Sequence, residues 1–336
     1  MIKQVASFYR CPGTGDPLTL EVARALAGRV SDGAFTAPDG RRYPVAGGIP
    51  DFTYPPVLAK SDAEARDYYD GNAAVYDQFL PLIFDTFKAD ETVARNSVID
   101  ELRLSPGSRV LEIGAGSGRD SALIQQRLGP DGQLFLQDIS PGIFAKAVER
   151  LKDASPQPAF FIANGSYLPF ADRTFDATYH FGGLNTFADI GRAFREAVRV
   201  TKVGGKVVMG DESMPPWLRE TDYGRVLMNS NPHYRHPVPL AHLPVEARNT
   251  RVRWLVGEVF YVIDFEVGEG LPYADLDREI PGARGGTHRT RYYGNLEGVT
   301  PESKALALAA ARESGKSMHR WLSDVIRDAA GKDTKK

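Results

Sequence analysis

One short stretch constrains the fold of this 336-residue chain more than any other. Residues 108–124 read SRVLEIGAGSGRDSALI, in which an apolar run ending at Ile113 leads into Gly-Ala-Gly-Ser-Gly, and helix-like spacing begins at about Arg119. Glycine has no Cβ, so the backbone turns tightly there and a ligand can approach it, while the start of a helix offers unpaired N–H groups. The stretch therefore predicts a strand, a ligand-binding turn and a helix in succession.

The sequence around this turn alternates between apolar, strand-like runs and helix-like segments. Such alternation, from about 107 to 210, is typical of βαβ units whose parallel sheet is buried on both faces. Residues 251–267 add two strand-like runs in succession, which favours an antiparallel pair at the sheet edge. We therefore expect an α/β fold with a Rossmann-like, doubly wound, mostly parallel sheet. The predicted parallel strands are Arg109–Ile113, Gln133–Gln137, Ala159–Ala163, Phe175–Phe181 and Lys206–Gly210.

The chain is longer than one average domain, so we expect additions to this core. Residues 1–56 are rich in Gly and Pro between short apolar stretches, which predicts a small β-rich module. The core then spans residues 57–290 and carries an irregular, aromatic-rich insert at 211–250 as a lid. Helical spacing in residues 301–330 predicts a helical hairpin within a C-terminal extension, residues 291–336.

Charge and cysteine content exclude several classes of protein. Lys and Arg number 41 against 43 Asp and Glu, so the chain lacks the strongly basic balance of many nucleic-acid-binding proteins. One cysteine excludes a disulfide framework and a four-cysteine zinc site. No apolar run approaches the roughly 18 residues of a membrane span, and the N-terminus lacks the apolar core of a signal peptide. We expect a soluble, cytoplasmic protein.

The residues around the glycine turn indicate which ligand it binds. The spacing is G-x-G-x-G, whereas dinucleotide-binding turns have G-x-G-x-x-G. Glu112 lies two positions before the first glycine, where it would attract the ammonium of an amino-acid-like cofactor and repel a pyrophosphate. Asp138 ends the next apolar run and suits a ribose diol. Asn164 and Gly165 end the third run and suit the edge of an adenine.

Together these motifs resemble the class I S-adenosylmethionine-dependent methyltransferases, especially the branch that includes ubiquinone and menaquinone biosynthesis methyltransferases. The resemblance covers about residues 70–270, with two departures: Asn164 replaces the family Asp of G-D-A-x-x-L-P-F, and Val203 replaces the Pro of R-V-x-K-P-G-G. It implies S-adenosylmethionine as cofactor. The cofactor-binding residues that it implies are Tyr76, Glu112, Gly114, Ala115, Gly116, Gly118, Asp138, Ile139, Asn164 and Gly165.

Methyl transfer from a sulfonium mainly requires alignment of acceptor and methyl, and it requires a base only when the acceptor loses a proton. Polar side chains at the ends of the fourth and fifth strands are the candidates for such a role. His180 is the best base because neutral imidazole titrates near working pH; the alternative is that it packs beneath the adenosine. The predicted catalytic residues are His180, Tyr179 and Asp211.

The insert supplies candidate contacts to the methyl acceptor. Its aromatic side chains suit a lid over an aromatic or prenyl-like molecule, and the alternative is a solvated loop. His233 and His236 have ligand-like spacing, but no third ligand is evident, so we predict no metal site. The predicted substrate-binding residues are Asn185, Trp217, His233 and His236.

Both terminal segments resemble known modules. Residues 1–56 are similar to a zinc-ribbon module that activates tRNA methyltransferases and precedes some bacterial 23S ribosomal RNA methyltransferases. Its ligand positions hold Cys11, Thr14, Thr36 and Asp39, which cannot form a thiolate cage, so we expect a module without metal. Residues 305–329 resemble the helices of ribbon-helix-helix dimers, with 289–299 as the ribbon strand. The alternative is a helical hairpin that covers the sheet or mediates dimerisation.

Three functions follow from these features. The first is S-adenosylmethionine-dependent methylation of C or O of a small-molecule metabolite by in-line displacement, with a homodimer formed through the C-terminal tail. The second is methylation of an RNA base, against which the lost zinc ligands and the near-neutral charge count. The third is a cofactor-responsive DNA-binding protein, which only the tail suggests. We expect the first function, with RNA or DNA as the less favoured partners.

Overall fold

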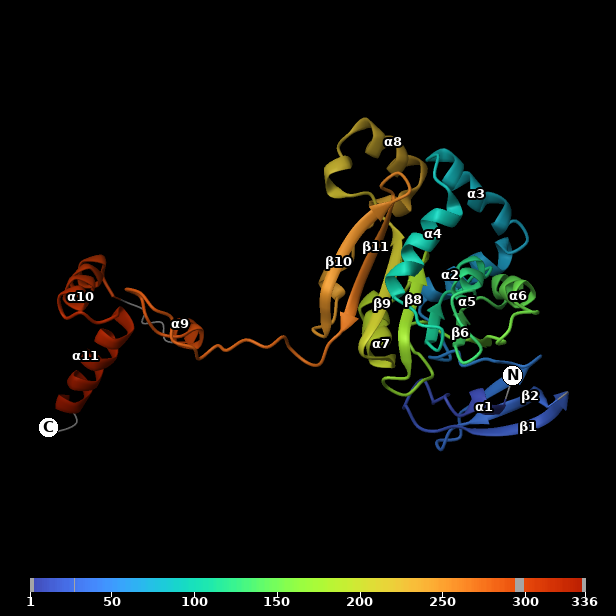
Figure 1. Cartoon of the computed structure of the whole chain (residues 1–336), viewed down its shortest axis with the longest axis horizontal. Helices are drawn as coiled ribbons and strands as arrows, with labels where there is room; N and C mark the ends of the chain where they lie inside the picture. Colours follow the sequence, from blue (N-terminus) through green and yellow to red (C-terminus); the bar gives the residue numbers. More distant parts are fainter. Residues whose placement is uncertain (1–2, 27, 294–298, 334–336) are drawn as a thin grey trace. The chain divides into compact units, whose positions relative to one another are not determined.

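The computed structural model describes residues 3–26, 28–293 and 299–333, which divide into two compact units, Met1–Leu271 and Pro272–Lys336. None of the helices in these described ranges is both long and apolar enough to cross a membrane. The larger unit contains a seven-stranded sheet and a separate four-stranded sheet (Figure 1). The smaller unit is helical.

The seven-stranded sheet has the order β10-β11-β9-β8-β5-β6-β7. Strand β5 pairs in parallel with β6 and β8, and the parallel ladder continues to β7 and β9. Strand β11 is antiparallel to both β9 and β10. The expected mostly parallel sheet with an antiparallel edge pair is thus confirmed. The strands are β5 Arg109–Ile113, β6 Gln133–Asp138, β7 Ala159–Ile162, β8 Phe175–Phe181, β9 Thr201–Glu212, β10 Ala247–Leu255 and β11 Phe260–Val267.

Helices pack on both faces of this sheet. Side chains of α4, α5 and α6 pack with Val110, Leu134 and Leu136 on the first face. Helix α7 buries Phe194 against β9 and β11 on the second face. The helices of this unit that follow residue 59 are α2 Lys60–Asn72, α3 Tyr76–Thr86, α4 Glu91–Ile99, α5 Arg119–Gln125, α6 Pro141–Arg150, α7 Ile190–Val200 and α8 Asp222–Ser230.

The rest of the second face is covered by the N-terminal sheet. This antiparallel sheet has the order β1-β2-β3-β4 and follows the short helix α1, Lys3–Ala6. Tyr9 and Phe52 meet Phe161 and Phe170 of the core, with ring centroids of Tyr9 and these three residues 4.7 to 5.7 Å apart. One hydrophobic cluster therefore joins the first 56 residues to the parallel sheet. The strands are β1 Thr19–Leu26, β2 Arg29–Thr36, β3 Arg42–Ala46 and β4 Ile49–Pro50.

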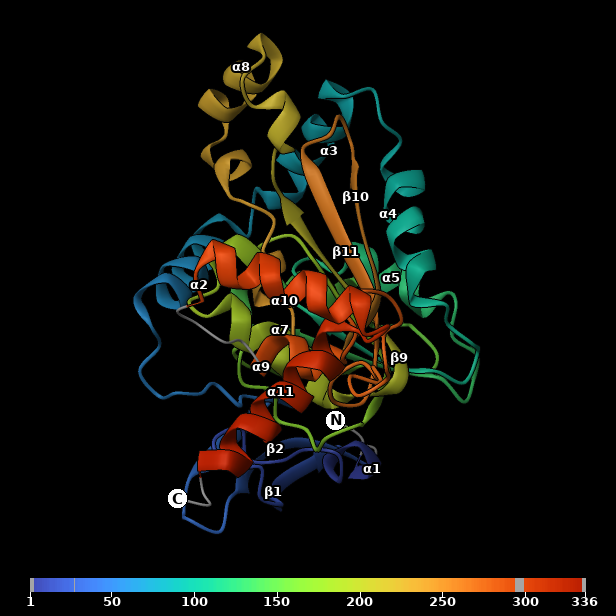
Figure 2. The same cartoon turned by 90° about the vertical axis from the view of Figure 1, so that its left-hand side faces the viewer.

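The 211–250 insert is more regular than its composition predicts. Helix α8 lies within it, because the Thr221 hydroxyl caps the helix by accepting from the Gly224 N–H. Side chains of α8 and α3 share a hydrophobic cluster with Phe260, so the two helices lie at the same end of the sheet (Figures 1 and 2).

The smaller unit contains α9 His288–Tyr293, α10 Pro301–Glu313 and α11 Met318–Asp333, and α10 contacts α11 (Figure 2). The chain reverses between α10 and α11 at Gly315, whose φ of +64° favours glycine. The prediction of a ribbon strand over 289–299 is wrong for its first part, which is helix α9. The Thr287 hydroxyl caps that helix by accepting from the Thr290 N–H at 3.1 Å. Residues 294–298 lie outside the described residues.

Candidate functional site

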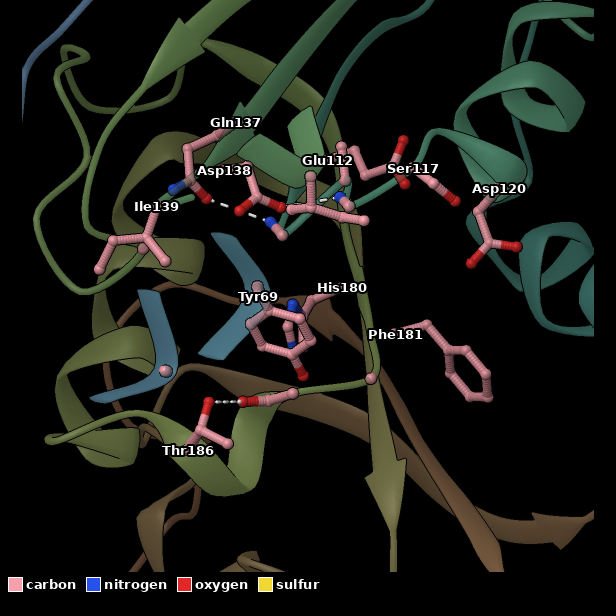
Figure 3. Close-up of a pocket in the computed structure, with 18 of the residues that line it drawn as sticks. Tyr69, Glu112, Ser117, Asp120, Gln137, Asp138, Ile139, His180, Phe181 and Thr186 are labelled. Atoms are coloured by element: carbon pink, nitrogen blue, oxygen red, sulfur yellow. Dashed lines mark hydrogen bonds between the residues drawn. The ribbon is translucent and has the colours of Figure 1, made fainter. Parts of the chain in front are cut away.

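A cleft opens at the carboxyl ends of β5, β6 and β8, where the strand order reverses. Ligands of open α/β sheets bind at such a switch point. Figure 3 shows Glu112, Gln137, Asp138 and His180, which come from the ends of these strands, together with Tyr69 from helix α2. All the predicted cofactor residues line this cleft except Gly118.

The glycine turn is held in place by the end of β6. Gly114 and Gly116 have φ of +66° and +55°, which L-residues with a side chain rarely adopt. The Gly114 N–H donates to Oε1 of Gln137 at 3.1 Å, and the Gly116 N–H donates to Oδ2 of Asp138 at 2.7 Å. Gly118 has another role: a Cβ on it would lie 2.9 Å from Ala147, so it allows α5 and α6 to pack closely.

Glu112 presents an unsatisfied carboxylate to the cleft. Its side chain is 2% exposed, and its Oε2 has no hydrogen-bond partner among the described residues. Burial, and next the charge of Asp120, raises the pKa of Glu112 well above its usual range. Arg95, which also lines the cleft, donates to Asp120 at 2.9 Å and to Glu91 at 2.7 Å. A cationic ligand group would therefore satisfy Glu112.

Asp138 is the second buried carboxylate of the cleft. Burial raises its pKa to about 6, although the N–H groups of Ser140 and Gly116 oppose the shift. The Ser140 N–H donates to its Oδ1 at 2.9 Å. Each carboxylate oxygen retains a lone pair, so the group can accept hydrogen bonds from a ligand diol.

One ring nitrogen of His180 is hydrogen-bonded within the protein, and the other is not. Its Nδ1 lies 2.8 Å from the carbonyl oxygen of Ile113. A carbonyl only accepts, so Nδ1 carries the proton and Nε2 has the lone pair. Nε2 is buried without a partner among the described residues. Burial lowers the pKa of His180 below its usual value, which leaves a neutral imidazole at the cleft wall.

Tyr179 faces away from His180, as alternate residues of a strand do. It packs in the core on the first face of the sheet, and its hydroxyl donates to Oδ2 of Asp120 at 3.1 Å. Tyr179 is not among the residues that line the cleft. Its contact with the site is through Asp120.

A second cavity adjoins the first and shares Tyr69, Tyr76 and Phe181 with it. Its empty space is about 2140 Å³, against about 870 Å³ for the first, and both include space open to solvent. One end is polar, with Asp211, Glu212, Asn231 and His233. The apolar walls include Val75, Phe79, Leu80, Ile83, Phe84, Leu255, Val256 and Phe260.

Two neighbouring carboxylates at this polar end differ in their environment. Asp211 accepts from the N–H groups of Gly183 and Asn185, at 3.0 and 2.5 Å, one on each oxygen. Glu212 accepts from Nδ2 of Asn231 at 2.9 Å. Burial, and next the charge of Asp211, raises the pKa of Glu212 to about 7. Glu212 can therefore exchange a proton near neutral pH.

The structure separates the predicted substrate-binding residues. His233 lines the second cavity and stacks on His236, with ring centroids 5.8 Å apart. Asn185 donates its side-chain amide to the backbone oxygen of Glu212 and lines neither cavity. Trp217 is 63% exposed and packs edge-on against Trp254. Among the described residues, no three His, Cys, Asp or Glu side chains are grouped as metal ligands.

Sequence reasoning missed four charged residues of the cleft: Arg119 and Asp120, which begin α5, and Asp62 and Arg95, which lie in two earlier helices. Asp62 lies in the first turn of α2, and Arg95 lies in α4. Both helices precede the glycine turn in the chain, and no local motif marks either side chain. The one available signal was an acidic or basic residue on the apolar side of a predicted helix.

Comparisons with known proteins identify relatives of this chain. A family model described as "Methyltransferase domain" matches residues 110–205. A demethylmenaquinone methyltransferase of Beutenbergia cavernae is 36% identical over 124 residues, which is 37% of this chain and 48% of the relative. A demethylmenaquinone methyltransferase of Streptomyces griseus is 32% identical over 177 residues, which is 52% of this chain and 72% of the relative.

A ubiquinone/menaquinone biosynthesis C-methyltransferase of Xanthomonas oryzae is 33% identical over 121 residues, covering 35% of this chain and 48% of the relative. The chain thus spans about half the length of the first curated relatives that it matches. Among solved structures, Haemonchus contortus phosphoethanolamine N-methyltransferase 2 in complex with S-adenosyl-L-methionine has a TM-score of 0.48 and 13% identity. That match covers 68% of this chain and 62% of the other.

Proposed function

This chain belongs to the methyltransferase family of the demethylmenaquinone and ubiquinone/menaquinone biosynthesis C-methyltransferases, and on that premise we propose that it methylates a small-molecule metabolite at C or O. S-adenosylmethionine is the cofactor. The observation that carries the proposal is Glu112, a buried carboxylate with an unpartnered oxygen beside a glycine turn. That oxygen fits the ammonium of an amino-acid-like cofactor and disfavours a pyrophosphate.

The other cleft residues fit the remaining parts of the cofactor. Asp138 would hold the ribose diol, and Asn164 with Gly165 would border the adenine. The Gly114–Gly116 turn leaves room for the ligand against the backbone, and Tyr76 borders both cavities. When bound, S-adenosylmethionine supplies an activated methyl group on a sulfonium.

We assign to His180 the role of the base that accepts a proton from the methyl acceptor. Its Nε2 carries a lone pair in a buried wall of the cleft, and its lowered pKa keeps that nitrogen unprotonated near neutral pH. We assign Asp211 and Tyr179 to positioning. Asp211 fixes the turn at Gly183–Asn185, and Tyr179 holds Asp120 beside Glu112.

The second cavity is the proposed acceptor site. Its apolar walls suit a molecule with an apolar body, and Glu212 and His233 suit a polar head that donates hydrogen bonds. Arg95 is the only Lys or Arg among the described residues lining this cavity, and it is paired with Asp120 and Glu91. An acceptor with a carboxylate or phosphate is therefore disfavoured.

Transfer of a radiolabelled methyl group from S-adenosylmethionine into a lysate of the source organism tests this function. We expect label in a small molecule that an organic solvent extracts. Label in RNA would instead support the alternative of an RNA base methyltransferase. Cofactor binding with no label in any fraction would support the cofactor-responsive DNA-binding protein.

The two ends of the chain add finer proposals. Exposed apolar side chains on α10 and α11, among them Leu306, Val325 and Ile326, support a homodimer formed through the C-terminal extension. That the protein is cytoplasmic stays a prediction. Light scattering of the full chain and of I326D tests this, and we expect a dimer and a monomer respectively. The zinc-ribbon resemblance of residues 1–56 stays a prediction. There Cys11 is buried with its Sγ 3.4 Å from the Tyr43 hydroxyl.

A further inference from the structure

A carboxylate–amide pair lies in the wall of the cofactor cleft. Asp62 belongs to helix α2 and Asn164 follows strand β7, and both side chains line the cleft. They are 6% and 1% exposed, and Nδ2 of Asn164 donates to Oδ2 of Asp62 at 2.9 Å. No described Lys, Arg or His forms an ion pair with Asp62. The pair therefore combines residues 102 positions apart in the chain into one buried polar surface.

The hydrogen bonds of the pair leave capacity for a ligand. Oδ1 of Asp62 accepts from the Ala188 N–H at 2.9 Å, and Oδ1 of Asn164 accepts from the Ser166 N–H at 2.9 Å. A carboxylate has about four acceptor positions, and a side-chain amide has two N–H donors. The carboxylate thus retains acceptor positions next to one uncommitted N–H of the amide. Each side-chain oxygen and nitrogen of the pair already has one partner within the protein, so a ligand would use only this remaining capacity.

We propose that Asp62 selects the base of the cofactor by accepting from the exocyclic amino group of adenine, with the Asn164 amide donating to the neighbouring ring nitrogen. The inference rests on the proposed function, because that function places an adenosyl group in this cleft. An acceptor beside a donor complements the adenine edge, which has an amino donor beside a ring acceptor. Hypoxanthine has the reverse order, an oxygen acceptor beside a ring N–H donor, so the pair rejects it.

Calorimetry with two ligands tests this pair directly. The ligands are S-adenosylhomocysteine and S-inosylhomocysteine, which differ only in the amino or oxygen group on the base. We expect the full-length wild type to prefer the adenosyl ligand by about tenfold or more, as for a hydrogen bond to a charged group. D62N should lose this preference. D67N is the matched control, since Asp67 lies on the same helix with its side chain 77% exposed, and it should keep the wild-type ratio.

The exchanged double variant D62N/N164D gives the sharpest result. The amide at position 62 still donates to the carboxylate at position 164, and the Ala188 and Ser166 N–H groups keep their acceptors. Only the order of acceptor and donor facing the ligand is reversed. We expect this variant to prefer the inosyl ligand.

The outcomes separate the inference from the function on which it rests. Wild-type preference retained in D62N, or in the double variant, would overturn the role of Asp62. So would a wild type that binds both ligands equally. A wild type that binds neither ligand would instead overturn the proposed cofactor. If D62N does not fold, as circular dichroism would show, the double variant still decides, because it keeps the hydrogen bonds of the pair.

Discussion

The two cavities of the cleft are built in different ways. The cofactor half is formed by the ends of adjacent strands, and its turn is fixed by hydrogen bonds from Gly114 and Gly116 to the two residues that end β6. The half proposed for the acceptor is assembled from α2, α3, α4, the ends of β8 and β9, and the β10–β11 pair. Its walls are mostly apolar side chains from distant parts of the chain. Under the proposed function, one half thus recognises its ligand by polar groups, and the other mainly by shape.

This difference predicts which substitutions affect cofactor affinity and which affect turnover. The cofactor half leaves buried polar atoms for a ligand, such as Oε2 of Glu112. In the acceptor half, the buried carboxylate of Asp211 is already bonded on both oxygens to backbone N–H groups. Four substitutions test the contrast, ordered from the largest expected effect to the smallest.

D138A should abolish measurable binding of S-adenosylhomocysteine in calorimetry, with a loss of about a thousandfold or more. The substitution removes the proposed ribose contact and also leaves the N–H groups of Gly116 and Ser140 without their acceptor. D131A, at an exposed aspartate in the loop before β6, is the control and should bind normally. Unchanged affinity in D138A would refute the placement of the ribose.

H180N should slow methyl transfer by about a hundredfold, a typical contribution of acid–base catalysis, while cofactor affinity changes by less than about twofold. An asparagine amide can still donate to the Ile113 carbonyl but has no equivalent of the Nε2 lone pair. Single-turnover kinetics and calorimetry measure the two quantities. A normal rate in H180N would mean that another group accepts the proton. Glu212 would then be tested first, with the variant E212Q.

E112Q should weaken cofactor binding by about ten- to thirtyfold through loss of a charged hydrogen bond. The raised pKa means that Glu112 holds its proton at pH values where an ordinary glutamate is ionised. An ammonium favours the ionised form, so wild-type affinity should rise with pH, and binding should release a proton. Calorimetry in buffers of different ionisation heat measures that release. Equal proton release from E112Q would assign it to another group, such as Asp138.

F79A should raise the KM for the acceptor by about fivefold, because it removes apolar contact area from one wall of the second cavity. Cofactor affinity and kcat should not change. L82A is the matched control, since Leu82 is an exposed apolar residue of the same helix that lines neither cavity. An effect of F79A on cofactor affinity would contradict the division of the cleft into two halves.

The sequence was sufficient to predict those residues of the candidate site that lie directly after a recognisable strand. The parallel strands and the cleft positions of Glu112, Asp138 and Asn164 follow from the apolar runs and what comes directly after them. Alternation in β8 implies that Tyr179 and His180 face opposite sides, but the pattern does not indicate which side is the cleft. The face of β8 that lines the cleft is decided by how the helices and the N-terminal sheet pack on the parallel sheet.

Non-local packing explains the other failures. Asp62 and Arg95 reach the cleft from helices that precede the sheet, so no spacing rule relates them to the glycine turn. Gly118 has a left-handed backbone like Gly114 and Gly116, yet its lack of a side chain makes room for Ala147 and not for a ligand. The position of the N-terminal sheet was not predictable either, since its aromatic partners, such as Phe161 and Phe170, lie more than 100 residues later.

The aromatic cluster shared by the N-terminal sheet and the core has a consequence for synthesis of the protein on the ribosome. Tyr9 and Phe52 pack against Phe35 of their own sheet, but their contacts with the core form only once Phe161 and Phe170 have been translated. At about 5 to 20 residues per second, translation from Phe52 to Phe170 takes roughly 6 to 24 seconds. The surfaces of Tyr9 and Phe52 that face the core in the folded protein are therefore exposed during that interval, when they can be bound by chaperones.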